Sequence, residues 1–101
     1  MLRVEMKSTN LVPGDKGSLV AYSDSTMEVV ILCYVQPPNP PELSGCDQCG
    51  SFRIQSGVEF NFSTNKELFE KNHGYLQITI ENSSGEQWLH KINFGGRTLI
   101  A

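Results

Sequence analysis

The chain has no long hydrophobic run and no strong charge of one sign. Its longest apolar stretch, Val29 to Val35, is far shorter than the ~20 residues that a helix needs to cross a bilayer. Eight basic and eleven acidic residues are mixed along the sequence and give a formal net charge of -3. So small and dispersed a charge does not attract phosphate backbones strongly. We therefore expect no membrane span and no nucleic acid as a partner.

Cysteine is also scarce, and its count is odd. Three cysteines do not make a disulfide framework and are more typical of a reducing compartment. The first residues alternate between apolar and charged side chains instead of forming the apolar block of a secretory signal. These features predict a cytoplasmic protein.

What the chain does have is regular alternation of apolar and polar side chains, strongest between residues 75 and 94. A period of two is the signature of half-buried strands. Gly85 suits the left-handed last position of a three-residue loop between Asn82 and Glu86. We therefore predict a β-hairpin, and a shift of one residue would turn its polar side chains inward. The predicted register pairs Ile80 with Trp88, Ile78 with His90, and Leu76 with Ile92.

Similar patterns predict further strands at residues 2–7, 18–22, 26–36 and 52–62, with a terminal edge strand at 97–100. Residues 26–36 are apolar on both parities in the middle, which favours a central strand covered on both faces. In residues 52–62 the even-numbered side chains are apolar on both sides of Gly57. We interpret them as one long strand, bent at Gly57, that passes from one sheet to the other at a corner.

One short helix is expected near residues 65–72. Thr64 and Glu67 have the spacing of a capping box, with Leu68 and Phe69 pointing inward. Together these elements predict an all-β, mainly antiparallel protein, a small β-sandwich or barrel of about seven strands. At 101 residues the chain is long enough for one domain, residues 1–101, and one core.

The loop at residues 36–51 differs in kind from the rest. Four of residues 37–41 are prolines, which fix φ and remove backbone donors, so this part must be extended chain outside any sheet. It suits either a stiff spacer or a ligand for an aromatic groove. A connection of about 15 residues is longer than usual, and such loops are often functional.

Cys46 and Cys49, separated by two residues at a turn, form half of a zinc knuckle. No second such pair exists, and Cys33, His73 and His90 are the only other candidate ligands. Three readings remain: an inert pair of thiols, a Cys46–Cys49 disulfide, and a zinc site. We expect the inert pair, and so no cofactor, with zinc at Cys46 and Cys49 as the alternative.

His90 is the only candidate for a catalytic base on the predicted hairpin. Its parity matches that of Trp88 and Ile92, so a packed histidine is the simpler interpretation. Its nucleophile would be Cys33 or a serine, but no Gly-x-Ser-x-Gly elbow is present. We expect a protein that is not an enzyme, and a small hydrolase centred on His90 is the least favoured alternative.

The opposite face of the hairpin is an amphipathic strip that carries Tyr75, Gln77, Thr79, Leu89 and Lys91. It is either covered by the short helix or left open, and if open it is suited to recognition. With no catalytic set assembled, we predict a module that binds another protein, such as an inhibitor, an immunity protein or an accessory protein of phage or bacterial assemblies. A homodimer through the first or last strand is compatible with this role. The predicted binding residues are Pro38, Asn39, Pro40, Glu42, Leu43, Asp47, Gln48, Tyr75, Gln77 and Leu89.

Overall fold

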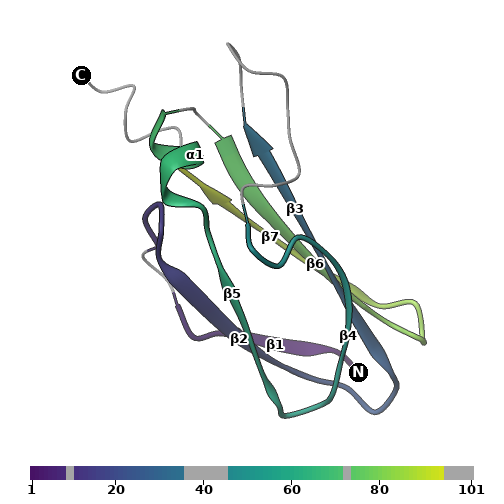
Figure 1. Ribbon diagram of the computed structural model, residues 1–101. Coiled ribbons are helices and arrows are strands. Elements are labelled where there is room, and N and C mark those ends of the chain that lie inside the picture. The colour runs from purple at the N-terminus through teal and green to yellow at the C-terminus, as the bar shows by residue number, and fades with distance from the viewer. Residues whose placement is uncertain (9–10, 36–45, 72–73, 95–101) are drawn as a thin grey trace.

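Two antiparallel sheets form the body of the protein in the computed structural model (Figure 1). The structure describes residues 1–8, 11–35, 46–71 and 74–94. One sheet has the strand order β1-β2-β5 and the other the order β4-β3-β6-β7, with no closed barrel among the described strands. The fold is therefore a β-sandwich with one short helix. In chain order the elements are β1 (Arg3–Met6), β2 (Lys16–Tyr22), β3 (Met27–Val35), β4 (Gly50–Ile54), β5 (Glu59–Ser63), α1 (Lys66–Lys71), β6 (Gly74–Asn82) and β7 (Gln87–Asn93).

This strand order resembles that of immunoglobulin-like sandwiches. The first, second and fifth strands share one sheet, and the third, sixth and seventh strands share the other. The fourth strand lies beside the third strand rather than beside the fifth. An arrangement of this kind supports many unrelated functions, so it describes the scaffold alone.

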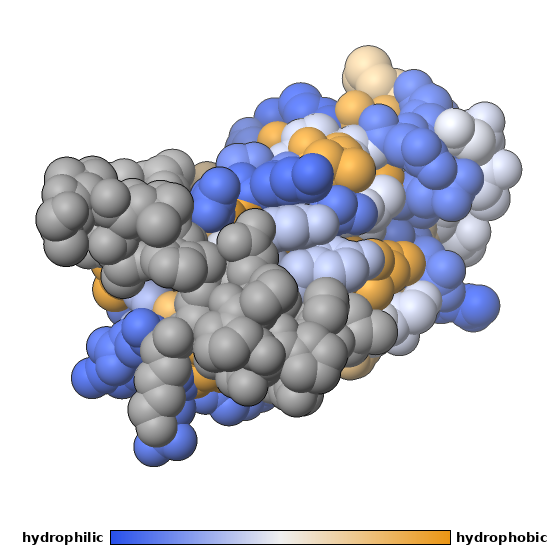
Figure 2. Space-filling model, turned by 90° about the horizontal axis from the view of Figure 1, so that it is seen from above, coloured by the Kyte–Doolittle hydropathy of each residue, from blue (hydrophilic) through white to orange (hydrophobic). Residues whose placement is uncertain are grey.

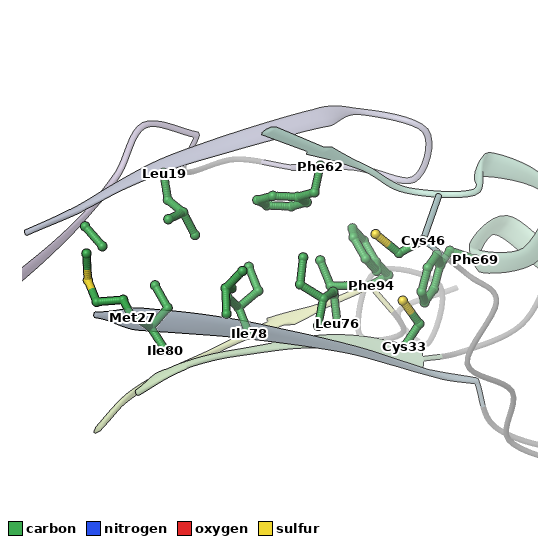
Figure 3. Packing of buried hydrophobic residues seen from close by; sticks show 13 residues of the cluster. Leu19, Met27, Cys33, Cys46, Phe62, Phe69, Leu76, Ile78, Ile80 and Phe94 are labelled. Carbon is green, nitrogen blue, oxygen red and sulfur yellow. The ribbon is translucent and has the colours of Figure 1, made fainter. Parts of the chain in front are cut away.

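The core lies between the two sheets and is lined by alternate side chains of each strand. Figure 3 shows Leu19 and Phe62, from the three-stranded sheet, facing Leu76, Ile78 and Ile80 in the other sheet. The ring of Phe62 lies directly over Gly17, its cross-strand neighbour, and would collide with any Cβ at that position. Any larger residue at position 17 would therefore force the buried Phe62 ring to move.

The predicted hairpin is confirmed in both pairing and turn. Ile80 lies opposite Trp88, Ile78 opposite His90 and Leu76 opposite Ile92. The backbone amide of Asn82 donates to the backbone carbonyl of Glu86 over 3.1 Å, and Gly85 has a φ of +89°. A positive φ at this position is what glycine accommodates without strain.

β3 is a central strand, as predicted, but its two faces are not equally enclosed. It lies between β4 and β6, and its odd-numbered residues, from Met27 to Cys33, are buried. The even-numbered residues Val30, Leu32 and Tyr34 are only half-buried. Their apolar character reflects a partly exposed outer face rather than a second covering layer of described residues.

The long strand predicted for residues 52–62 is two strands, each in a different sheet. β4 belongs to the four-stranded sheet and β5 to the three-stranded one, so the chain does change sheets near Gly57. A turn closed by the Val58 amide on the Gln55 carbonyl, 3.2 Å away, separates them. Phe52 and Phe60 then face each other with ring centroids 5.7 Å apart. The turn leaves Val58 53% exposed, so the even-numbered apolar side chains of residues 52–62 do not all face the interior, as a single strand would require.

The helix begins one residue later than the predicted capping box implies. The Asn65 side chain, not that of Thr64, accepts the Leu68 amide over 3.1 Å. Thr64 is buried, and its hydroxyl accepts the Gly14 amide over 2.8 Å. Phe69 points inward as predicted. The predicted strand at 97–100 lies outside the described residues.

Candidate functional site

Half of the predicted binding residues lie outside the part of the chain that the structure describes. These are Pro38, Asn39, Pro40, Glu42 and Leu43. Asp47 and Gln48 are described and exposed. The Asp47 carboxylate accepts the Ser63 hydroxyl over 2.5 Å, and the Asp47 amide donates to the Ser63 carbonyl over 3.0 Å. Asp47 therefore fastens the segment before β4 to the end of β5.

The other three predicted residues lie on the outer face of the four-stranded sheet. Tyr75 is opposite Tyr34 of β3, and the two rings stack with centroids 4.9 Å apart at an angle of 25°. The Nζ of Lys91 lies 4.9 Å from the centre of the Tyr75 ring. Such a cation–π contact holds the ring from its second side. The two aromatic rings are thus preorganised on a surface that water reaches.

Two further rows of side chains continue this surface. Gln77 lies between Leu32 and Lys91, and Thr79 lies between Val30 and Leu89. Leu89 is 56% exposed, one of the most exposed large hydrophobic residues described. We call this surface the tyrosine face, and its members are Val30, Leu32, Tyr34, Tyr75, Gln77, Thr79, Leu89 and Lys91.

No described element forms a layer over the tyrosine face. The helix α1 does not cover it, because Phe69 packs into the core against Phe94 with ring centroids 4.6 Å apart. Figure 2, which looks at the molecule from above the view of Figure 1, shows hydrophobic side chains as small patches among hydrophilic ones.

The three cysteines lie together at the end of the sandwich nearest α1. Cys33, at the end of β3, forms a disulfide with Cys49. The pairing of Ile31 with Gly50 brings these two cysteines side by side. The predictions of an inert thiol pair and of a Cys46–Cys49 disulfide are therefore both wrong. Local sequence spacing suggested Cys46 as the partner of Cys49, but the pairing of β3 with β4 brings Cys33 to Cys49 instead.

Cys46 is the free cysteine, and it is buried beside the disulfide. A backbone bridge to Thr64 holds it in place, and Figure 3 shows it next to Phe69 and Phe94. Burial raises the pKa of the Cys46 thiol, and the neighbouring Asp47 charge raises it further. A thiol held protonated in this way is a weak nucleophile.

All three sulfur atoms lie within 4.8 Å of one another. Three sulfur donors at this spacing are close enough to bind a soft or borderline metal ion such as zinc. In the disulfide-bonded form only one of them, Cys46, is available as a thiolate. The cluster includes Cys33, which sequence reasoning named only as one of three further candidate ligands.

His90 has the position of a packed side chain. It is half-buried, and its ring stacks on that of Trp88 with centroids 5.7 Å apart at an angle of 15°. Cys33, the cysteine considered as its nucleophile, is engaged with Cys49. The structure therefore offers no support for a catalytic pair of His90 and Cys33.

A polar hollow of about 400 Å³ lies at the hairpin end of the four-stranded sheet. Its lining includes Glu28 of β3, whose cross-strand neighbours are Arg53 of β4 on one side and Glu81 of β6 on the other. None of the described binding residues predicted from the sequence lines this hollow. It therefore does not belong to either candidate site.

No protein-family model matches this chain, and no curated protein matches it. None of the described helices is both long and apolar enough to span a membrane.

Proposed function

We propose that the protein is a non-enzymatic module that binds another protein through the tyrosine face and the loop at residues 36–51. The observation that carries the proposal is the stacked pair of Tyr34 and Tyr75 beside the exposed Leu89. Tyrosine rings anchor many protein interfaces because they combine a large apolar surface with a polar hydroxyl.

Preorganisation supports this role. Ordering a flexible side chain on binding costs free energy, and the stack together with Lys91 has already ordered the Tyr75 ring. Gln77 and Thr79 supply hydrogen-bonding groups between the apolar side chains. The face thus combines apolar anchors, polar groups and one cation, which suits a protein partner with an acidic or hydroxylated rim.

The net charge of -3 and its even distribution favour a protein partner over nucleic acid. An inhibitor, an immunity protein or an accessory protein of a phage or bacterial assembly would need a rigid small scaffold of this type and no catalytic residues. The predicted contribution of Asp47 and Gln48 is secondary, because Asp47 already binds Ser63.

A pair of matched surface variants tests the proposal. Leu89 and Val58 are similarly exposed, at 56% and 53%, but Val58 lies on the turn between β4 and β5. Tagged protein is used to capture partners from the native source, and the retained proteins are identified by mass spectrometry. We expect Leu89→Asp to lose a partner that the wild type and Val58→Asp both retain. Retention by all three forms would refute the tyrosine face as the docking surface.

The loop is tested separately. Replacing residues 37–45 with a glycine–serine segment of equal length keeps all three cysteines. We expect weaker capture of the same partner, because the segment would lose its four prolines, each of which fixes φ. Unchanged affinity in a titration of the purified pair would remove the loop from the proposed interface.

Self-association through an edge strand is a compatible proposal. β1 and β7 are edges of their sheets, and β7 carries Leu89. Sedimentation of the purified protein over a range of concentrations measures it. A homodimer that Leu89→Asp dissociates would mean that the second copy is the partner of the tyrosine face.

The second candidate is a thiol- or zinc-dependent protein that uses Cys46 and Cys49. The convergence of the cysteine sulfur atoms favours it. Two thiolates alone make an incomplete structural zinc site, because zinc usually takes four ligands. Cys49 is also bonded to Cys33 in this form of the protein.

We propose a cytoplasmic location, as the odd number of cysteines suggests, although a disulfide is more typical of oxidising compartments. Alkylation of thiols in a freshly quenched extract tests this location. Three labelled cysteines per chain would support it, and labelling of Cys46 alone would contradict it.

A further inference from the structure

The positions of the three cysteines depend on contacts other than the disulfide itself. The β3–β4 ladder extends to the pair Ile31 and Gly50, which is adjacent to Cys49 and two residues from Cys33. Cys46 is held by its bridge to Thr64 and by the hydrogen bond of the next residue, Asp47, to Ser63. Breaking the sulfur–sulfur bond therefore leaves three thiols that two independent sets of backbone contacts hold together.

The spacing of these thiols suits a single zinc ion. With zinc–sulfur bonds of about 2.3 Å in a tetrahedral site, neighbouring sulfur atoms lie about 3.8 Å apart. The three sulfur atoms are within 4.8 Å of one another in the disulfide-bonded form. Once the disulfide is open, small side-chain rotations at Cys33 and Cys49 would give three sulfur ligands at bonding distance.

The surroundings enclose the three sulfur atoms and leave one side open to solvent. Cys33 is fully buried and Cys46 is 5% exposed, whereas Cys49 is half-buried and gives access from solvent. The rings of Phe69 and Phe94, both in the core, line the inner side. Sulfur ligands in an apolar pocket with one open side would leave the fourth position of a tetrahedral zinc ion for water or another donor.

We propose that reduction of the Cys33–Cys49 disulfide creates a zinc site whose ligands are Cys33, Cys46 and Cys49, so that the disulfide and the metal exclude each other. A dithiol or phosphine reductant supplies two electrons, the sulfur–sulfur bond breaks, and each sulfur takes one proton. Zinc then binds three thiolates, and three thiol protons go to solvent. This inference deepens the zinc alternative by adding Cys33 and a redox condition, and it does not depend on the protein-binding proposal.

The test measures zinc bound to the full chain in two redox states. One sample is reduced with a phosphine, and the other keeps its disulfide, as mass spectrometry verifies. Both are incubated with zinc chloride, desalted without oxygen and analysed for metal. We expect about one zinc ion per reduced chain and almost none per oxidised chain. Equal zinc in the two samples, or none in a reduced chain, would overturn the proposal.

Variants separate the three-sulfur site from a two-sulfur site. Reduced Cys33→Ser should lose at least about tenfold in zinc affinity, measured by competition with a chromogenic chelator. Glu59→Gln, which removes an exposed charge at the other end of β5 and no sulfur, should bind as the wild type does. If Cys33→Ser binds zinc as tightly as the wild type, only the Cys46–Cys49 pair holds the metal and our inference is wrong.

A third set of measurements shows whether a failure to bind zinc is due to unfolding. Cobalt(II) replaces zinc, and its thiolate charge-transfer absorption grows with the number of sulfur ligands, while circular dichroism follows the sheets. If the reduced chain is unfolded without metal, addition of zinc should restore the β-sheet signal. Zinc that fails to restore it, or a cobalt spectrum with the same thiolate intensity in Cys33→Ser, would also overturn the proposal.

Discussion

The two ends of the sandwich are stabilised by different contacts, apolar and sulfur packing at one end and polar hydrogen bonds at the other. At the end near α1, Cys33, Cys46 and the rings of Phe69 and Phe94 pack together. At the hairpin end, Asn82 is buried at 3% exposure in a polar network. Its side-chain amide donates to Ser23 Oγ over 3.1 Å and to Glu86 Oε1 over 2.8 Å, and its Oδ1 accepts the Glu86 amide over 2.9 Å.

This difference determines which conditions affect each end. A disulfide responds to reductants, whereas hydrogen bonds to a carboxylate respond to acid and to the loss of one partner. Most contacts of Asn82 are local, within the turn that follows it, and the disulfide joins residues 16 positions apart. The stability of the sandwich should therefore depend on solution conditions in two separable ways.

Loss of the disulfide should have the largest effect. Cys49→Ala opens a covalent loop of about 15 residues, which should lower the free energy of unfolding by about 3 kcal/mol. Urea unfolding with and without reductant measures this loss. Wild-type protein in reductant should fall close to the variant.

Cys46→Ala is the control for this measurement, because it keeps the disulfide and should lose as much stability in reductant as the wild type does. Cys49→Ala, which lacks the disulfide, should unfold at the same urea concentration with and without reductant. If Cys49→Ala is as stable as the wild type in the absence of reductant, the disulfide does not stabilise this end of the sandwich.

Loss of the buried amide should have the next largest effect. Asn82→Ala leaves the Glu86 backbone amide without its acceptor and removes one hydrogen bond to Ser23, and we expect a loss of about 2 kcal/mol that reductant does not change. Asn61→Ala, at an exposed asparagine on β5, should cost much less. Equal stability of these two variants would show that the network contributes nothing measurable.

A change in the turn between β6 and β7 should have the third largest effect on stability. Gly85→Ala places a Cβ at a φ of +89°, and we expect a loss of about 1 kcal/mol from backbone strain. No atom lies within 4 Å of such a Cβ, so collision would not contribute to the loss. An increase in stability would mean that the turn adopts another conformation in solution.

The smallest effect should be the response to acid. The hydrogen bond from Asn82 holds the pKa of Glu86 below its usual value of 4.5, and the Met1 amine lowers it further. A depressed folded-state pKa gives stability that is present above pH 4.5 and lost as the pH falls through the folded-state value. Glu86→Gln should reduce this acid-dependent loss, measured by thermal unfolding between pH 3 and pH 6.

Glu86 is exposed, so added salt should weaken the ionic part of this effect. A wild type and a Glu86→Gln variant with identical pH profiles would contradict the assignment. The end that carries the cysteines should keep its response to reductant in both proteins.

The hairpin was predictable because its information is local. Alternation from Leu76 to Ile92, with Gly85 in the turn, is enough to set the pairing of two adjacent strands. The change of sheets near Gly57 was also visible in the parity of Phe52 and Phe60. The position of the turn was not, because parity alone does not show that Val58 would be exposed.

The candidate sites depend on contacts between strands that are distant in sequence. Tyr34 faces Tyr75, and Cys33 faces Cys49, only after β3 has paired with β6 on one side and with β4 on the other. Nothing in local spacing distinguishes these partners from other tyrosines and cysteines. Sequence reasoning therefore found Tyr75 and Cys49 but missed Tyr34, and it named Cys33 only as a further candidate ligand.

The Cys33–Cys49 bond also makes the protein a convenient scaffold for display. It brackets residues 34–48 with a covalent link, and the neighbouring Ile31–Gly50 pair anchors both ends of that segment to the sheet. The entropic penalty for lengthening a loop grows only with the logarithm of its length. A foreign peptide grafted into residues 37–45 should therefore leave the sandwich intact while its two ends stay clamped together.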